Sequence, residues 1–269
     1  MQTSFSDDCT NDPRHYRGAQ ERVAHALERY LPKVILDRVD VHERTVLLAI
    51  ETIVLFGVVS FVELLAPNII PFRLFEFWVI PKLSFEPIIQ AWPLFAWGAG
   101  LTTIVSILTR NEARLNRDAE QFLSKGFALS LMAGVFEEII FRWLLFFIAV
   151  PWVYVLNIVT FGIYSWLYTS VVGPIANLST LGLLEHILFN GYGWAVGSAV
   201  IVSNGMFRNG HRYQGLLGFV NSWFIGMLLF LIMFQHGLLV AILIHFLYDM
   251  FIFLVRYVDA AIERALGWD

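Results

Sequence analysis

Charged side chains are scarce in this sequence: Asp, Glu, Lys and Arg make up only 15% of its 269 residues, whereas a soluble domain carries about 25%. The net charge is −4 at pH 7, and the sequence pI is near 6.0. This charge balance argues against nucleic acid as a partner. Cysteine is nearly absent as well. Cys9 stands alone, so an intrachain disulfide is excluded.

Apolar residues are correspondingly frequent: they make up 58% of the chain, and the mean hydropathy is +0.66. Runs of about 20 apolar residues, each long enough to cross a bilayer as a helix, recur over residues 46–256. The runs are continuous blocks without the alternation of a lipid-facing strand, which disfavours a β-barrel. The sequence therefore predicts an all-α, polytopic bundle of seven or eight transmembrane helices.

Three parts are expected along the chain. Residues 1–45 form an extramembrane arm with an amphipathic helix, residues 46–256 form the transmembrane domain, and residues 257–269 form a short amphipathic tail. The polar first residues lack the apolar core of a signal peptide, so we expect the first internal span to direct insertion.

Arginine is frequent both in the arm and in residues 109–126, and two predicted spans separate these basic stretches. They therefore fall on the same side, which the positive-inside rule makes cytoplasmic. No eukaryotic retention or lipidation signal is present. We accordingly expect a multi-pass protein of a bacterial cell membrane with a cytoplasmic N-terminus.

The stretch VFEEIIFR, residues 135–142, places charge inside an apolar run. A charged side chain at mid-bilayer costs about 2.5–3.5 kcal/mol on insertion scales, so such residues normally face the protein interior and have a function. Arg142 follows Glu138 by four residues on one helical face, which predicts an ion pair. Glu137 points about 100° away in an α-helix. Its role must therefore differ from that of Glu138, and we expect it to accept a proton during catalysis.

Two further polar clusters lie in apolar surroundings. FRNGHRYQG, residues 207–215, contains His211, and HFLYD places His245 and Asp249 four residues apart on one helical face. Together with Glu137 these side chains come from three separate helices and could hold and deprotonate one water molecule. The alternative for each residue alone is structural, because Glu–Arg pairs join helices and most buried histidines are simply hydrogen-bonded.

These segments match three motifs in order. EEIIFR fits EExxxR, FRNGH fits FxxxH, and HFLYD fits HxxxN/D. Over about residues 126–256 the sequence resembles the CAAX protease and bacteriocin-processing (CPBP/Abi) family of intramembrane proteases, which includes the type II CAAX prenyl endopeptidases. The resemblance implies an endopeptidase that hydrolyses a peptide bond near the C-terminal or membrane-anchored region of a membrane protein or lipidated peptide.

The resemblance also implies roles for individual residues. Glu137 would be the general base and His211 would bind or activate the attacking water. His245 and Asp249 would steady the oxyanion or complete the water site.

The family's second glutamate and its arginine match Glu138 and Arg142, which take supporting roles. Metal dependence stays open at this stage, because two histidines with carboxylates suit zinc, whereas a metal-free glutamate mechanism needs the same groups. The HExxH helix of common zinc proteases is absent. If a metal is bound, its ligands would come from Glu137, His211, His245 and Asp249.

Two departures from the family pattern carry expectations of their own. Arg142 and Phe207 are separated by enough chain for about two spans, which predicts an inserted hairpin within residues 150–203. The last motif ends in Asp249, where the prenyl-processing branch favours asparagine, so cleavage of a prenylated CAAX tail is not expected.

Two other functions compete with the intramembrane endopeptidase. The first is a non-catalytic membrane protein (a transporter, immunity or scaffold factor) that uses the buried charges for packing or proton relay. The second is a serine protease of the rhomboid type. Ser198 follows Gly197, but the glycine that should follow the serine is missing.

Overall fold

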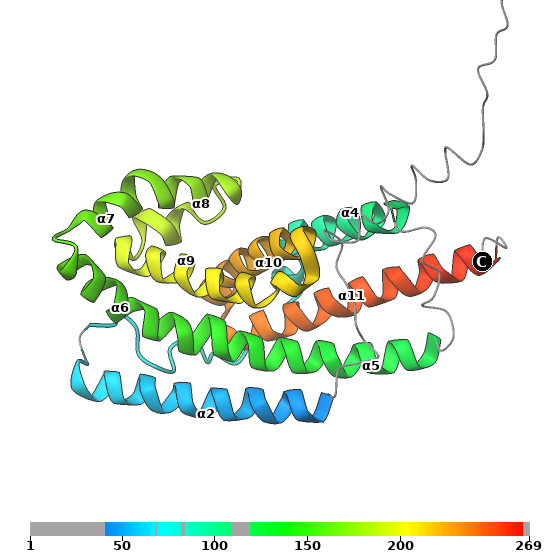
Figure 1. The fold of residues 1–269 in the computed structure, drawn as a ribbon, viewed down its shortest axis with the longest axis horizontal. Coiled ribbons are helices and arrows are strands. Elements are labelled where there is room, and N and C mark those ends of the chain that lie inside the picture. The colour runs from blue at the N-terminus through cyan, green and yellow to red at the C-terminus, as the bar shows by residue number, and fades with distance from the viewer. Residues whose placement is uncertain (1–40, 68, 82–83, 109–118, 266–269) are drawn as a thin grey trace, which may run out of the picture.

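The computed structural model describes residues 41–67, 69–81, 84–108 and 119–265, which form helices and connecting turns without a strand (Figure 1). Most of the predicted N-terminal arm and the basic residues 109–118 lie outside this described part. The longer elements, in chain order, are α2 (Val41–Leu65), α4 (Trp92–Leu108), α5 (Ala119–Met132), η3 (Ala133–Leu144), α6 (Leu145–Val159), α9 (Gly193–Gly210), α10 (Gly215–His236) and α11 (Leu238–Ala265).

Four helices in the described residues are long and apolar enough to cross a membrane. Their spans are Thr45–Leu65, Gly126–Val159, Arg212–His236 and Leu238–Asp259. The predicted all-α class and transmembrane character are therefore confirmed for this part of the chain, but the count of seven or eight spans is not. α4 has only 17 described residues. α9 contains several polar residues and glycines, which lower its hydropathy. The helix can contain them because half of its residues are buried by neighbouring helices.

The core of the bundle forms around α9, which packs against α6, α10 and η3, while α11 packs against η3, α10, α5 and α4. α2 covers the outer side of η3. In a bilayer the apolar side chains gain little from leaving lipid, so close van der Waals packing holds such helices together. The most deeply buried side chains of this core include Leu144, Phe146, Val150, Leu188, Val200, Met227, Phe230, Met233 and Ile244.

A glycine allows η3 and α11 to touch at their backbones. A Cβ atom at Gly134 would lie 3.1 Å from the carbonyl oxygen of Ile242 and 3.2 Å from the amide nitrogen of Phe246. Any larger residue would push the two helices apart. This close approach determines how near the side chains of η3 come to those of α11.

The connection between α2 and α3 (Glu86–Gln90) is not helical, yet it packs firmly on the bundle. Trp143 Nε1 donates a hydrogen bond to the Leu74 carbonyl oxygen at 2.6 Å. The carbonyl oxygen of Phe77 accepts from the Leu238 amide at 2.7 Å. The loop therefore covers the end of the bundle where α10 turns into α11 at Gly237. Its buried side chains are Ile70, Phe72, Leu74 and Phe77.

The chain between the first two motifs forms a helical excursion. α6 continues without a break through Pro151 to Val159. The chain then reverses near Gly162, whose φ is +88°. Three consecutive short helices follow, and η5 leads back into α9 (Figure 1). These short elements are α7 (Ile163–Leu167), η4 (Tyr168–Val172), α8 (Gly173–Ser179) and η5 (His186–Asn190).

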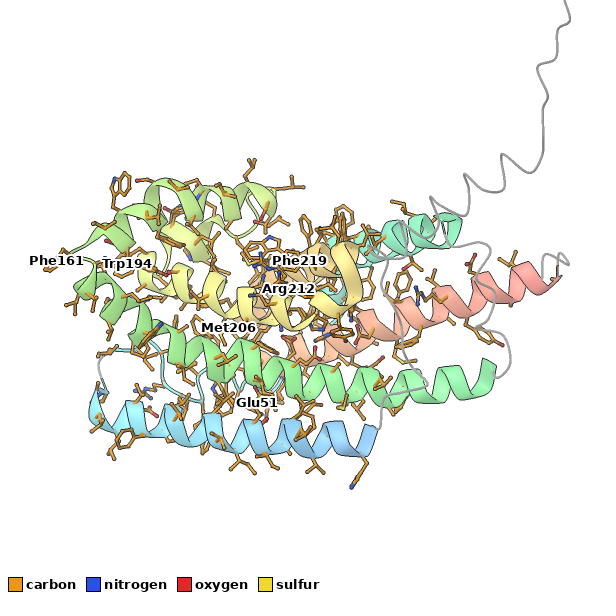
Figure 2. All side chains as sticks on the ribbon, viewed as in Figure 1. Glu51, Phe161, Trp194, Met206, Arg212 and Phe219 are labelled. Carbon is orange, nitrogen blue, oxygen red and sulfur yellow. The ribbon has the colours of Figure 1, made fainter. Side chains whose placement is uncertain are left out.

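Side chains along the outside of the bundle are mostly apolar (Figure 2). Phe161, at the tip of the turn after α6, is 95% exposed.

The last helix, α11, runs to Ala265. The described part of the expected 257–269 tail is therefore the last part of that helix.

Candidate active site

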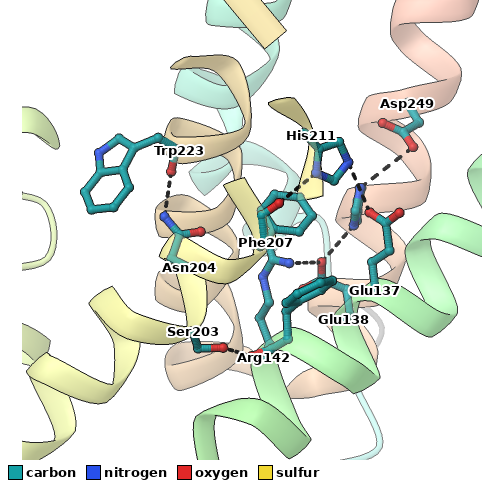
Figure 3. Close-up of polar contacts among 11 residues, drawn as sticks. Glu137, Glu138, Arg142, Ser203, Asn204, Phe207, His211, Trp223 and Asp249 are labelled. Carbon is teal, nitrogen blue, oxygen red and sulfur yellow. Dashed lines mark hydrogen bonds and ion pairs between the residues drawn. The ribbon is translucent and has the colours of Figure 1, made fainter. Parts of the chain in front are cut away.

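The EExxxR motif lies on η3, where the helix has π geometry. At its end the Leu145 amide bonds to the carbonyl of Ile140, five residues earlier. π-helical segments are rare and are frequent at functional sites. Both glutamates of the motif are buried here, although they point to different neighbours (Figure 3). An α-helical periodicity predicts different roles for the two carboxylates but not this wider helix.

Glu138 joins two helices through one oxygen atom. Its Oε1 accepts a hydrogen bond from His245 Nδ1 at 2.7 Å and lies 3.2 Å from Nη1 of Arg142. The predicted ion pair with Arg142 is therefore present, and both side chains are completely buried. The contact with His245 is additional and links η3 to α11 over 107 residues of sequence.

Arg142 is held from the side by an aromatic ring. Its guanidinium carbon lies 3.9 Å from the centre of the Phe207 ring, which provides a cation–π contact in a buried setting. Phe207 also packs against the imidazole of His211, with 4.5 Å between ring centres. The phenylalanine of the FxxxH motif thus separates the buried arginine from the histidine of the same motif.

His211 follows the last residue of α9, with Arg212–Gln214 forming the short helix η6 behind it. Its Nδ1 lies 2.9 Å from the Phe207 carbonyl oxygen. A carbonyl oxygen can only accept, so Nδ1 carries the proton in this contact. The other nitrogen, Nε2, faces Oε2 of Glu137 at 3.7 Å. Polar atoms at such a separation suit a bridging water molecule.

His245 has the same arrangement on α11. Its Nδ1 donates to Glu138, and its Nε2 lies 3.7 Å from Oδ2 of Asp249. The Asp249 side chain is 26% exposed, more than those of Glu137, His211 and His245. The cluster is therefore most open beside Asp249, and each imidazole directs Nε2 toward a carboxylate (Figure 3).

The structure thus places the six residues singled out from the three motifs in a cluster of two adjoining groups, with the Phe207 ring in contact with both. The groups are Glu138, Arg142, His245 and Asp249 on one side and Glu137 with His211 on the other. Ser198, the candidate nucleophile of the rhomboid alternative, lies elsewhere on α9. Its hydroxyl is buried and bonded to the Tyr164 hydroxyl of α7 at 2.6 Å.

The donor types in the cluster are those that zinc prefers. Within the described part of the chain, no three His, Cys, Asp or Glu side chains group closely enough to hold a metal ion. Both Nδ1 atoms are engaged by protein acceptors, which is the usual arrangement of a metal-binding histidine and leaves each Nε2 as the available nitrogen. Zinc binding by Glu137, His211, His245 and Asp249 stays a prediction.

Two buried polar residues of α9 that the sequence analysis did not select bond to backbone carbonyls of the neighbouring helices. The Ser203 hydroxyl donates to the Phe141 carbonyl on η3. Asn204 Nδ2 donates to the Trp223 carbonyl oxygen on α10 at 3.0 Å. Asn204 precedes Phe207 by three residues, and that spacing places both on one helical face. The spacing is the one sequence signal that could have identified Asn204.

No protein-family model, no curated protein and no solved structure matches the chain. Function is therefore inferred from the geometry of the cluster and from the three motifs.

Proposed function

We propose that this protein is an intramembrane endopeptidase that uses a water molecule activated by Glu137 and His211. One observation carries the proposal: two imidazoles from different helices each have Nδ1 engaged by a protein acceptor and Nε2 facing a carboxylate oxygen at 3.7 Å. The resemblance of the three motifs to the CAAX protease and bacteriocin-processing family supports the same function.

The attacking water would lie between Glu137 Oε2 and His211 Nε2. In the neutral tautomer of His211 both atoms are acceptors, so one water can donate a proton to each. Glu137 takes the first proton while the water oxygen bonds to the carbonyl carbon of the substrate. The product of this step is a tetrahedral intermediate with a negatively charged oxygen.

His245 would stabilise that oxygen. It contacts Glu138 at Nδ1 and faces Asp249 at Nε2, and in its cationic form both nitrogens are donors. An oxyanion that forms beside Nε2 would accept a hydrogen bond from it. Glu137 passes the proton it accepted to the amide nitrogen as the C–N bond breaks, which releases an amine and a carboxylic acid and restores the carboxylate of Glu137.

The apolar surroundings indicate the class of substrate. A peptide reaching the cluster beside Asp249 must enter between membrane-spanning helices, so it would be a membrane-anchored or lipidated segment. We place the protein in a bacterial cell membrane with its N-terminus in the cytoplasm. Seven or eight spans would require that α4 and α9 cross in addition to the four long spans and that the excursion from α7 to η5 supplies the remainder.

Hydrolysis can be tested with the purified protein in phospholipid vesicles prepared in oxygen-18 water. The probe is a defined set of apolar transmembrane peptides and acylated peptides, with new termini detected by mass spectrometry. The wild type should produce fragments whose new carboxyl group carries oxygen-18. Glu137→Gln should lower the rate at least about a hundredfold, the lower range for a lost general base.

Glu51→Gln provides a matched control, because Glu51 is an exposed glutamate of α2. Its cleavage rate should stay at the wild-type level. Equal cleavage by the wild type and by Glu137→Gln would contradict the assignment of the base.

A second function is favoured by the chain of contacts Glu138–His245–Asp249, which is an acid–imidazole–acid series of the kind that relays protons in transporters. A non-catalytic transporter of this kind would acidify or alkalinise the vesicle lumen without producing new peptide termini. A pH-sensitive dye trapped in the same vesicles distinguishes the two functions.

A further inference from the structure

We infer that Tyr213 binds the backbone of a peptide that has unwound at the candidate active site, with its hydroxyl donating to a peptide carbonyl oxygen. The inference rests on the proposed function, because it concerns how the substrate of that site is held. Tyr213 follows His211 by two residues in the short helix η6 and belongs to none of the three motifs.

The Tyr213 ring lies beside the imidazole of His211. The two ring centres are 6.2 Å apart, and the ring planes differ by only 26°. The Phe207 ring packs against the same imidazole at 4.5 Å, but Phe207 is buried, whereas Tyr213 is 56% exposed. Phe207 therefore borders His211 on the interior side, and Tyr213 borders it on the open side.

The open side of His211 belongs to the open end of the cluster. Figure 3 shows His211 and Asp249 at one end of the cluster and Arg142 at the other. The attacking water would lie between His211 Nε2 and Glu137 Oε2, which are 3.7 Å apart. A peptide whose carbonyl carbon meets this water must run past the residues that border His211.

Tyr213 is held in place by the residue that follows it. Gln214 Nε2 donates a hydrogen bond to the Tyr213 hydroxyl oxygen at 3.1 Å, and the Gln214 backbone amide donates to the His211 carbonyl oxygen at 3.0 Å. Gln214 directly precedes α10, and its side chain lies against the first turn at Gly218, where a Cβ atom would be 2.9 Å from Oε1. An exposed ring fixed in this way loses little freedom when it binds a ligand.

The hydroxyl proton of Tyr213 is available to a ligand. A phenol hydroxyl can donate one hydrogen bond and can also accept, and here it accepts from Gln214. In the described part of the chain, no acceptor lies within hydrogen-bonding distance of the hydroxyl proton. The donor is therefore free for a group that reaches the open side of His211.

A peptide from an apolar membrane segment needs such a donor. While the segment is helical, each carbonyl oxygen accepts from the amide four residues further on, and the peptide bond is closed to attack. Unwinding leaves carbonyl groups without donors, which is costly where no water can replace the lost contact. A hydroxyl beside His211 offsets this cost at the place where the peptide bond is presented, and the ring packs against apolar side chains of the same segment.

Tyr213→Phe tests the inference, because it removes the hydroxyl and keeps the ring. The matched control is Tyr154→Phe: Tyr154 is an exposed tyrosine of α6 that packs against Trp194 at 5.4 Å. Both substitutions are made in the full chain, once with Glu137 and once with Glu137→Gln, so that binding is measured without cleavage. The probes are two fluorescent leucine–alanine transmembrane peptides in detergent micelles. One is a continuous helix, and the other has a central Gly-Pro pair that interrupts the helix.

Tyr213→Phe should raise the Kd of the Gly-Pro peptide about three- to tenfold, the effect of one lost hydrogen bond. The Kd of the continuous helix should not change, because its carbonyl groups already have donors. For any probe that the chain with Glu137 cleaves, KM should rise by the same factor while kcat stays near the wild-type value, as expected for a contact made equally in the ground state and the transition state. Tyr154→Phe should change none of these quantities.

An equal Kd of the Gly-Pro peptide for Tyr213→Phe and for its parent would overturn the inference, and so would the absence of binding to both. An equal loss with Tyr154→Phe or with the continuous helix would also overturn it, because the hydroxyl would then act on the fold or on apolar adsorption. Failure of the proposed hydrolysis gives a different result: the parent binds the Gly-Pro peptide through Tyr213, yet no new terminus carries oxygen-18. Cleavage of a probe with the same KM in Tyr213→Phe would leave hydrolysis standing and refute the role of Tyr213.

Discussion

Glu138 is the residue on which the buried charges depend. It supplies the negative charge beside Arg142 and the acceptor for His245, and its side chain has no exposure to solvent. Removing one partner of a buried ion pair leaves the other without compensation and typically costs about 3–5 kcal/mol. Glu138→Gln should therefore lower the free energy of unfolding by about that amount, measured by thermal or denaturant unfolding in detergent.

The double variant Glu138→Gln/Arg142→Met provides the control. Replacing both charges by neutral side chains removes the uncompensated cation, so most of the lost stability should return. If the two substitutions simply add, the contact between Glu138 and Arg142 contributes no coupling energy, and the predicted role of Glu138 is wrong.

Residue spacing predicted part of this cluster and missed the rest. The pair Glu138–Arg142 follows from a separation of four residues on one helix. The hydrogen bond from His245 to Glu138 spans 107 residues, and no local periodicity reports on such a contact. Asn204 was missed because its one signal, a position three residues before Phe207, lies in a helix with several other small polar residues.

At the scale of elements, the meeting of η3 and α11 controls the cluster. Gly134 lets the backbones approach, and a Cβ there would meet two backbone atoms of α11 at 3.1 and 3.2 Å. Backbone atoms cannot rotate away as a side chain can. Gly134→Ala should therefore lower stability by about 1–3 kcal/mol, as overpacking does. It should also lengthen the Glu138–His245 contact and reduce the rate of peptide cleavage.

Gly100→Ala is the matched control on α4, because a Cβ atom there meets nothing within 4 Å. Alanine is the better helix former by about 0.5–1 kcal/mol, so this variant should be as stable as the wild type or slightly more stable. Comparing the unfolding curves of Gly134→Ala and Gly100→Ala in the same detergent distinguishes the cost of close packing from the gain in helix propensity. A stable, fully active Gly134→Ala protein would show that the helices can move apart without consequence.

The long elements were predictable and the irregular ones were not. Apolar runs identified α2, η3 with α6, α10 and α11, because each must cover about 20 residues to cross a bilayer. The π geometry of η3, and the change to π geometry in η4 between α7 and α8, depend on tertiary contacts. The first residues of the range in which the hairpin is predicted, 150–203, still belong to α6, which runs through Pro151 to Val159. Proline breaks helices in water more readily than in a membrane, where neighbouring helices compensate.

For the whole molecule, hydropathy predicted a bundle of transmembrane helices. It could not determine whether a helix with polar residues also crosses the membrane. α9 is the decisive case, because it carries the FxxxH motif and the side chains of Ser203 and Asn204, yet falls short of the apolar threshold that the four long spans meet. A helix surrounded by protein need not be apolar, so its composition reflects its neighbours more than the lipid.

Whether α9 crosses the membrane determines the sidedness of the protein. Phe161 lies in the turn after α6 and Tyr213 lies beside Arg212 after α9, and Figure 2 places Phe161 and Arg212 far apart along the bundle. The side chains of Phe161 and Tyr213 are 95% and 56% exposed, so a cysteine at either position can be reached by a labelling reagent.

If the excursion from α7 to η5 returns to the side of the membrane on which it starts and α9 then crosses, Phe161 and Tyr213 face opposite sides. In a Cys9→Ser background, Phe161→Cys should react with an impermeant maleimide added to intact cells, whereas Tyr213→Cys should react only after permeabilisation. Labelling of both positions from the same side would mean that α9 does not cross, and the cluster of His211 and Glu137 would then open toward the opposite face.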